Sequence, residues 1–182
     1  YITHPNHQTR KLSRTGHTSW TLTAVEFTNG PYLDTNTSTT TISTSAHTVG
    51  AGVTMTASAS TFVATDVGRQ VRFRDGYGII TAFTSTTVVT IEILIDMGAT
   101  SASTDWSLGS FSTTTGFPSC VSFFEQRLVF AGTINNPQTV YFSKSGDYES
   151  MDANIGGTIA DDDAIIYTIA SNQVNAIRFM TS

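Results

Sequence analysis

The sequence predicts an all-β protein, and three observations support this prediction. The chain of 182 residues holds 33 threonines and 20 serines, and threonine, like the valine, isoleucine and aromatic residues around it, is common in strands. Apolar and polar residues alternate in short stretches, whereas no window of a dozen residues repeats its apolar positions every 3.6 residues. Glycine, proline, asparagine and aspartate cluster between these stretches. We therefore expect short antiparallel strands joined by turns.

Each expected strand is a short β-branched or alternating stretch that ends at a turn signal. The expected strands are Ser19–Phe27, Val53–Ala57, Gln70–Phe73, Gly78–Phe83, Val88–Ile95, Trp106–Leu108, Cys120–Ala131, Thr139–Ser143, Ala164–Ala170 and Ala176–Met180. The turn signals include "TNGP" at 28–31, "RDGYG" at 74–78, "INNP" at 134–137, "KSGD" at 144–147 and "NIGG" at 154–157.

Composition changes twice along the chain, which predicts one domain inserted into another. Residues 37–105 begin with a run of Ser, Thr and Ala and continue as a short hairpin and meander, typical of a small β-barrel-like module. Residues 106–182 are richer in aromatic side chains, and their successive hairpins are typical of propeller blades. We expect residues 1–36 and 106–182 to form a propeller-like or sandwich antiparallel β body. An insertion at a loop tip costs little in loop closure.

The charge pattern excludes several classes of function. Charged residues make up only 13% of the chain and the net charge is −5, with no basic run interleaved with aromatics, so a dedicated nucleic-acid-binding face is not expected. The single Cys120 excludes an internal disulfide, and no Cys/His cluster has zinc spacing. No apolar run approaches the roughly 20 residues of a membrane helix. We expect no membrane helix, no metal and no cofactor.

Glu125 and Arg127 form the first candidate site. They lie two residues apart in "SFFEQRLVFAGT", and residues two apart on a strand share a face. A neighbouring Arg would lower the pKa of Glu125, whereas a general acid needs a raised pKa. An Arg on a partly buried strand instead makes forked hydrogen bonds to a carboxylate or to turn carbonyls. We interpret Glu125 and Arg127 as a structural ion pair rather than catalytic residues.

The densest acidic cluster is Asp161, Asp162 and Asp163, in "ADDDA". This triplet lacks the alternating oxygen ligands and the glycine of an EF-hand loop, so a solvated turn is its ordinary interpretation. Calcium binding and repulsion of a passing polyanion from a channel wall stay open as alternatives.

Two other stretches have a simple structural interpretation and a chemical alternative. Ser143 and Lys144 adjoin in "FSKSGD", but a Ser-Lys nucleophile usually separates the two residues, so we interpret the stretch as a turn with Gly146 at positive φ. The basic "HPNHQTRKLSR" before Trp20 is expected to be a loop that either contacts a phosphate or a subunit, or guards a solvated edge.

An ordered set of motifs resembles one known family. Its strongest part runs from Gly116 to Asp147 and contains "GFP", "QRLVFAGT", "NPQTV" and "SKSGDY", and further matches are "EFTNGPYLD", "FVATDVGRQVRF" and "DDDAIIYTIASNQVNAIRFM". These motifs resemble the tail nozzle, or tail tubular protein B, family of short-tailed bacteriophages. The chain is much shorter than a full nozzle subunit, and we expect it to be a piece of one.

The resemblance implies a virion structural protein with no enzymatic activity. Family members form a ring of six copies in the virion tail, below the portal and adaptor and beside the tail fibres. The ring continues the DNA ejection channel, so double-stranded DNA passes without specific binding.

Two other functions remain open. A carbohydrate- or receptor-binding β module of a phage tail fibre would stack Trp20, Trp106 or Tyr77 on sugar rings. A glycan-degrading enzyme would need a second carboxylate near Glu125, for which Asp147 and Glu149 are the candidates.

Overall fold

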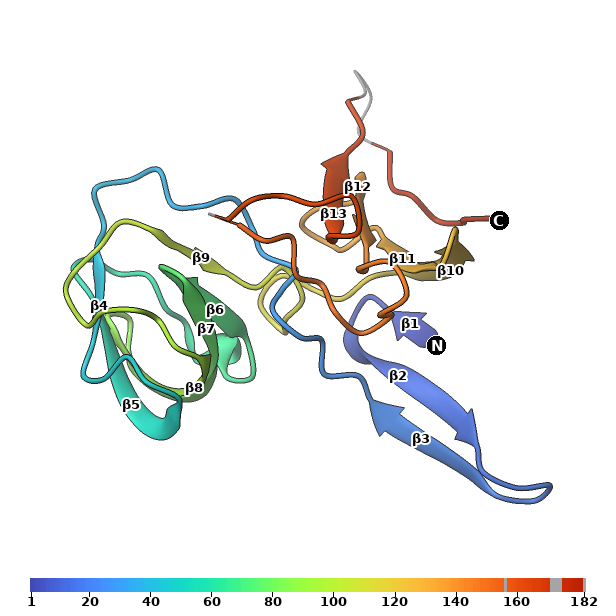
Figure 1. The fold of residues 1–182 in the computed structure, drawn as a ribbon, viewed down its shortest axis with the longest axis horizontal. Coiled ribbons are helices and arrows are strands. Elements are labelled where there is room, and N and C mark those ends of the chain that lie inside the picture. Colours follow the sequence, from blue (N-terminus) through green and yellow to red (C-terminus); the bar gives the residue numbers. More distant parts are fainter. Residues whose placement is uncertain (156, 171–174, 182) are drawn as a thin grey trace. The chain divides into compact units, whose positions relative to one another are not determined.

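The protein is all-β, as its sequence predicts. The computed structural model describes residues 1–155, 157–170 and 175–181, and this part of the chain contains strands and one 3-10 turn but no α-helix. The chain divides into two compact units. Unit 1 combines residues 1–31 with 115–182, and unit 2 is residues 32–114. Figure 1 traces both along the chain.

Unit 2 is a six-stranded antiparallel sheet that curls into a half-barrel. Its strands lie in the order β4-β5-β8-β7-β6-β9. Their bounds are β4 Ile42–Thr44, β5 Gly50–Ala57, β6 Gln70–Phe73, β7 Gly76–Ser85, β8 Val88–Ile95 and β9 Trp106–Leu108. Apolar and polar residues alternate along the strands, so one face of the sheet is buried and the other is exposed. In β5 the buried residues are Val53, Met55 and Ala57, and the exposed residues are Thr54 and Thr56.

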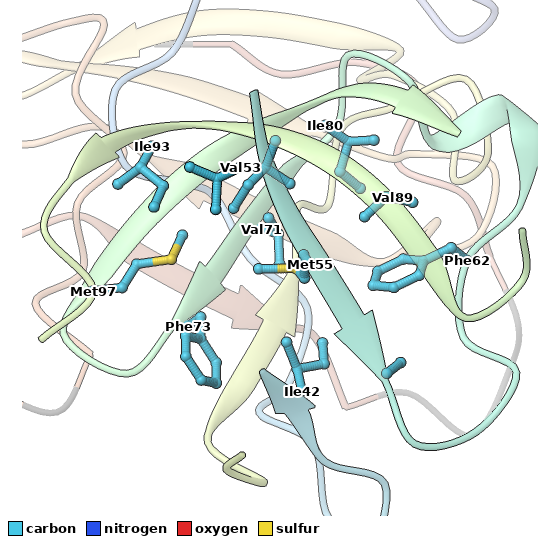
Figure 2. Close-up of a cluster of buried hydrophobic side chains, with 12 residues drawn as sticks. Ile42, Val53, Met55, Phe62, Val71, Phe73, Ile80, Val89, Ile93 and Met97 are labelled. Atoms are coloured by element: carbon cyan, nitrogen blue, oxygen red, sulfur yellow. The ribbon is translucent and has the colours of Figure 1, made fainter. Parts of the chain in front are cut away.

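The concave face of this sheet encloses a hydrophobic core. Figure 2 shows side chains from β4, β5, β6, β7 and β8 converging there, with Phe62 and Met97 from the connecting segments. Ile91, Ile93 and Val89 of β8 are fully buried. Each such aliphatic side chain stabilises the fold by about 1.5–3 kcal/mol.

The predicted boundaries of the inserted module differ from those of unit 2. Trp106–Leu108, which we assigned to the propeller-like body, is the edge strand β9 of the six-stranded sheet, where Val71 pairs with Leu108 and Phe73 with Trp106. Residues 32–36 also lie here, because the Leu33 N–H donates to the Leu108 carbonyl at 2.9 Å. The backbone groups of β6 and β9 need partners at the sheet edge. Amino-acid composition carries no information about which strands pair, so it could not place this boundary.

Unit 1 contains two sheets. A three-stranded antiparallel sheet comprises β1 (Ile2–His4), β2 (His7–Arg14) and β3 (Trp20–Ala24). A four-stranded antiparallel sheet in consecutive order comprises β10 (Cys120–Phe124), β11 (Arg127–Ala131), β12 (Thr139–Phe142) and β13 (Ile165–Thr168). An up-and-down sheet of four strands is the arrangement of a propeller blade, which is consistent with the expected propeller-like or sandwich β body.

Three predictions of local structure in unit 1 are wrong. The strand expected over Cys120–Ala131 is a hairpin, since its register pairs Phe124 with Arg127 and leaves Glu125 and Gln126 as a two-residue turn. The basic stretch expected as a loop is the strand β2. The strand expected over Ala176–Met180 does not form.

Candidate functional site

Arg127 is buried and binds backbone carbonyls. It is 9% exposed. Its Nη1 donates to the carbonyls of Ser143, at 2.7 Å, and Asp163, at 2.6 Å, and its Nη2 donates to the carbonyl of Asp161 at 2.6 Å. One guanidinium thus joins the start of β11 to the end of β12 and to the turn before β13, which is the turn-carbonyl alternative that the sequence left open.

The predicted ion pair between Glu125 and Arg127 is wrong. Glu125 and Gln126 have φ of 43° and 64°, the left-handed geometry of a type I′ hairpin turn. This turn removes Glu125 from the strand face that Arg127 occupies, and among the described residues no ion pair joins the two. The spacing argument failed because it assumed a continuous strand.

The acidic triplet has two different environments. The Asp163 carboxylate is buried, accepts the Ala160 N–H at 2.8 Å and lies 3.0 Å from Lys144 Nζ. Two hydrogen bonds hold the pKa of Asp163 below its ordinary value, and the bond from the Ala160 N–H has a larger effect than the bond from Lys144. Asp161 and Asp162 point to solvent. Within the described ranges, no group of three or more His, Cys, Asp and Glu residues is arranged to hold a metal ion.

The Ser-Lys stretch is a turn, as predicted. The buried Ser143 hydroxyl accepts the Leu128 N–H at 2.9 Å and donates to the Lys144 carbonyl at 3.0 Å. The backbones of Lys144 and Asp147 pair as an isolated antiparallel β-bridge across the turn, and Gly146 has a φ of 77°. The Ser143 hydroxyl is therefore committed to the backbone.

One face of the β1-β2-β3 sheet is apolar and exposed. The register pairs Ile2 with Arg10, Leu12 with Leu22 and Arg14 with Trp20, so these six side chains share a face, which we call the hairpin face. The exposed fractions of its apolar members are 50% for Ile2, 48% for Leu12, 57% for Trp20 and 56% for Leu22. The Arg14 guanidinium lies over the Trp20 ring, 5.8 Å from its centroid.

The reverse face of the hairpin is fastened to its own unit. Thr9 is buried there, and Lys11 Nζ lies 2.5 Å from Glu149 Oε1, which also accepts the Tyr1 hydroxyl at 2.8 Å. The hydrogen bond from Lys11 lowers the pKa of Glu149. The pKa of Tyr1 is raised, mainly by partial burial and secondly by the hydrogen bond to Glu149. Glu149 is thus an ionised acceptor, which does not suit the raised pKa of a general acid.

The strand β13 is a second exposed apolar element. Its residues Ile165, Ile166 and Tyr167 are 47%, 37% and 60% exposed, and Ile169 just beyond it is also exposed. Successive strand residues point to opposite faces. Both faces of β13 therefore carry exposed apolar side chains.

Of the three aromatic residues suggested for sugar stacking, only Trp20 has an open ring. Tyr77 is 5% exposed in β7. Trp106 packs against the core of unit 2, and its Nε1 donates to the Thr40 carbonyl at 3.0 Å. These two rings contribute to packing and offer no platform.

The hairpin face was missed because β2 was interpreted as a loop. A signal was present in "WTLTA", where apolar residues alternate with threonine directly after "TGHTS". β2 itself holds one apolar residue, Leu12, among four charged or histidine side chains, so its own sequence showed no alternation.

Comparisons with known proteins find no match, either among models of protein families or among curated proteins. A search of the described residues for a helix long and apolar enough to span a membrane finds none.

Proposed function

We propose that the chain is a non-enzymatic structural subunit of a bacteriophage virion tail, of the nozzle type. Copies of it form a ring below the portal and adaptor, next to the tail fibres, and enclose the DNA ejection channel. The observation that carries this proposal is the hairpin face, where four half-exposed apolar side chains adjoin on one side of a sheet. A contiguous apolar patch usually marks a surface that a partner covers.

The distribution of charge supports passage of DNA without capture. Each Lys or Arg that contacts a phosphate adds to salt-dependent affinity. Four of the cations, Lys11, Arg69, Arg72 and Lys144, instead pair with carboxylates of this chain, and the buried Arg127 binds three backbone carbonyls. With a net charge of −5, few cations remain for DNA.

The ring of six copies, the tail location and the portal, adaptor and fibre partners rest on the sequence resemblance alone. The tail-fibre alternative retains one favourable observation, the exposed Trp20 ring, because aromatic rings that bind sugars must be open on one face.

Native mass spectrometry and negative-stain imaging of the chain test the proposal. We expect oligomers with closed, ring-shaped projections and no retention of double-stranded DNA at physiological salt. A protein that stays monomeric at high concentration would contradict the assembly role. A stable trimer, with binding to a glycan array that Trp20→Ala abolishes, would favour the tail-fibre function instead.

A further inference from the structure

We propose that the hairpin face of one copy docks on the β13 strand of a second copy. This inference rests on the proposed function and names the contact by which neighbouring copies join. The receiving surface, which we call the β13 edge, consists of Asp161, Asp162, Ile165, Tyr167 and Ile169.

A copy does not cover its own hairpin face. The bond between Lys11 and Glu149 holds the reverse face toward the unit, which leaves Leu12, Trp20 and Leu22 pointing away from it. In Figure 1 the β2–β3 hairpin extends away from the β10–β13 sheet of its unit, and β13 lies at the far edge of that sheet. The two apolar surfaces of one copy do not cover each other, because their side chains remain about half exposed.

Charge complementarity identifies a second copy as the occupant. Residues 7–24 hold Arg10, Lys11 and Arg14 and no acidic residue, whereas residues 147–163 hold six acidic residues and no cation. The apolar side chains of the hairpin face are thus flanked by positive charge, and those of the β13 edge by negative charge. Two hairpin faces brought together would repel each other.

The charges that matter are those left after pairing within a copy. Lys11 is paired with Glu149, and Lys144 lies 3.0 Å from Asp163 but 3.9 Å from the largely exposed Asp162. Arg10 and Arg14 make no ion pair among the described residues, and Arg14 bonds only the Gly16 carbonyl and the His17 ring. Guanidinium groups bind carboxylates through paired hydrogen bonds. Arg10 and Arg14 of one copy can therefore meet Asp161 and Asp162 of the next.

The contact joins two different surfaces, so it is heterologous. A heterologous contact repeats from copy to copy and closes into a ring when the rotation between copies permits. This is the type of interface that a ring-shaped assembly requires.

Disulfide trapping tests the contact in a Cys120→Ser background, which removes the native thiol. One chain carries Leu22→Cys and another carries Tyr167→Cys, and the two are mixed and oxidised. We expect crosslinked dimers in the mixture and little crosslinking of either chain alone. Crosslinking of the Leu22→Cys chain with itself would show that two hairpin faces meet, and would overturn the inference.

Charge exchange gives an independent measurement. Arg10→Glu with Arg14→Glu, or Asp161→Arg with Asp162→Arg, is expected to reduce oligomers at least tenfold, and mixing the two variant chains is expected to restore pairing between them. Asp161 binds Arg127 through its carbonyl, so its side chain can change without loss of that bond. The control is Thr21→Glu with Thr23→Glu on the reverse face of β3, which should leave assembly unchanged.

The results separate this inference from the proposed function. If the wild-type chain forms no oligomer, both fail. The other case is that rings form, but the Leu22→Cys and Tyr167→Cys chains do not crosslink and the charge-exchange variants assemble like the wild type. The proposed contact is then wrong, and the proposed function stands.

Discussion

Arg127 Nη1 lies 2.6 Å from the carbonyl oxygen of Asp163, a residue 36 positions later in the chain. With the carbonyls of Ser143 and Asp161 as its other acceptors, this side chain holds three segments of unit 1 together. No carboxylate takes part, so the contact is a set of charge-assisted hydrogen bonds to the backbone.

Replacing Arg127 is therefore expected to destabilise unit 1. Arg127→Ala leaves three carbonyls without their donor, and we expect a loss of about 2–4 kcal/mol of unfolding free energy. Arg127→Lys retains the charge but not the forked hydrogen bonds, so its unfolding free energy should lie between those of the wild type and Arg127→Ala. Urea denaturation followed by tryptophan fluorescence measures both. Glu125→Gln is the control, because the two residues share no bond, and a loss equal to that of Arg127→Ala would contradict this account.

The turn at Glu125 and Gln126 is expected to improve with better turn residues. Both positions have positive φ, which Asn and Gly adopt more readily than Glu and Gln. Glu125→Asn with Gln126→Gly should stabilise the protein by about 0.5–1 kcal/mol, measured as a rise in the thermal midpoint. The same pair of residues placed at Ser122 and Phe123, inside β10, should destabilise it.

Asp66 and Arg69 form a buried ion pair in unit 2, with side chains 1% and 4% exposed. Asp66 also accepts the Val63 N–H and the Thr114 hydroxyl. Asp66→Ala strands the Arg69 charge in the interior, and we expect a loss of about 3–5 kcal/mol. Calorimetry of this variant, beside the exposed control Asp34→Ala, checks the prediction, and similar melting curves for the two would refute it.

Stability is expected to fall in acid because of Asp163. Its pKa is lowered by the Ala160 N–H and by Lys144, so the folded state binds this proton less readily than the unfolded state. The stabilisation is present above the unfolded pKa of about 3.9 and is lost as the pH falls through the lower folded value. Asp163→Asn should reduce the loss in urea midpoint between about pH 6 and pH 3. Asp162→Asn, at an exposed position, should change that loss much less.

The strands of unit 2 were largely predictable. β5, β6, β7 and β8 were expected within a few residues of their observed bounds, because each combines β-branched residues with a clear turn signal. β1, β2 and β4 were missed, since they are short or rich in cations and hydroxyls and rely on neighbouring strands for stability.

The candidate site was less predictable. Arg127 was recognised as structural, with turn carbonyls among its expected partners, but its pairing with Glu125 was wrong. The turn that separates them uses Glu and Gln at positive φ, where sequence rules expect Asn or Gly. No local signal marked it.

The sequence by itself determined that this protein is all-β, with low charge and turn-rich hairpins, because alternation and turn chemistry act over a few neighbouring residues. Only the tertiary structure decided which carbonyls Arg127 binds, that Trp106–Leu108 closes the edge of the six-stranded sheet, and that Leu12, Trp20 and Leu22 share an exposed face. These relationships join residues far apart in the chain or depend on strand register. Register is set by pairing across the sheet rather than by any one strand.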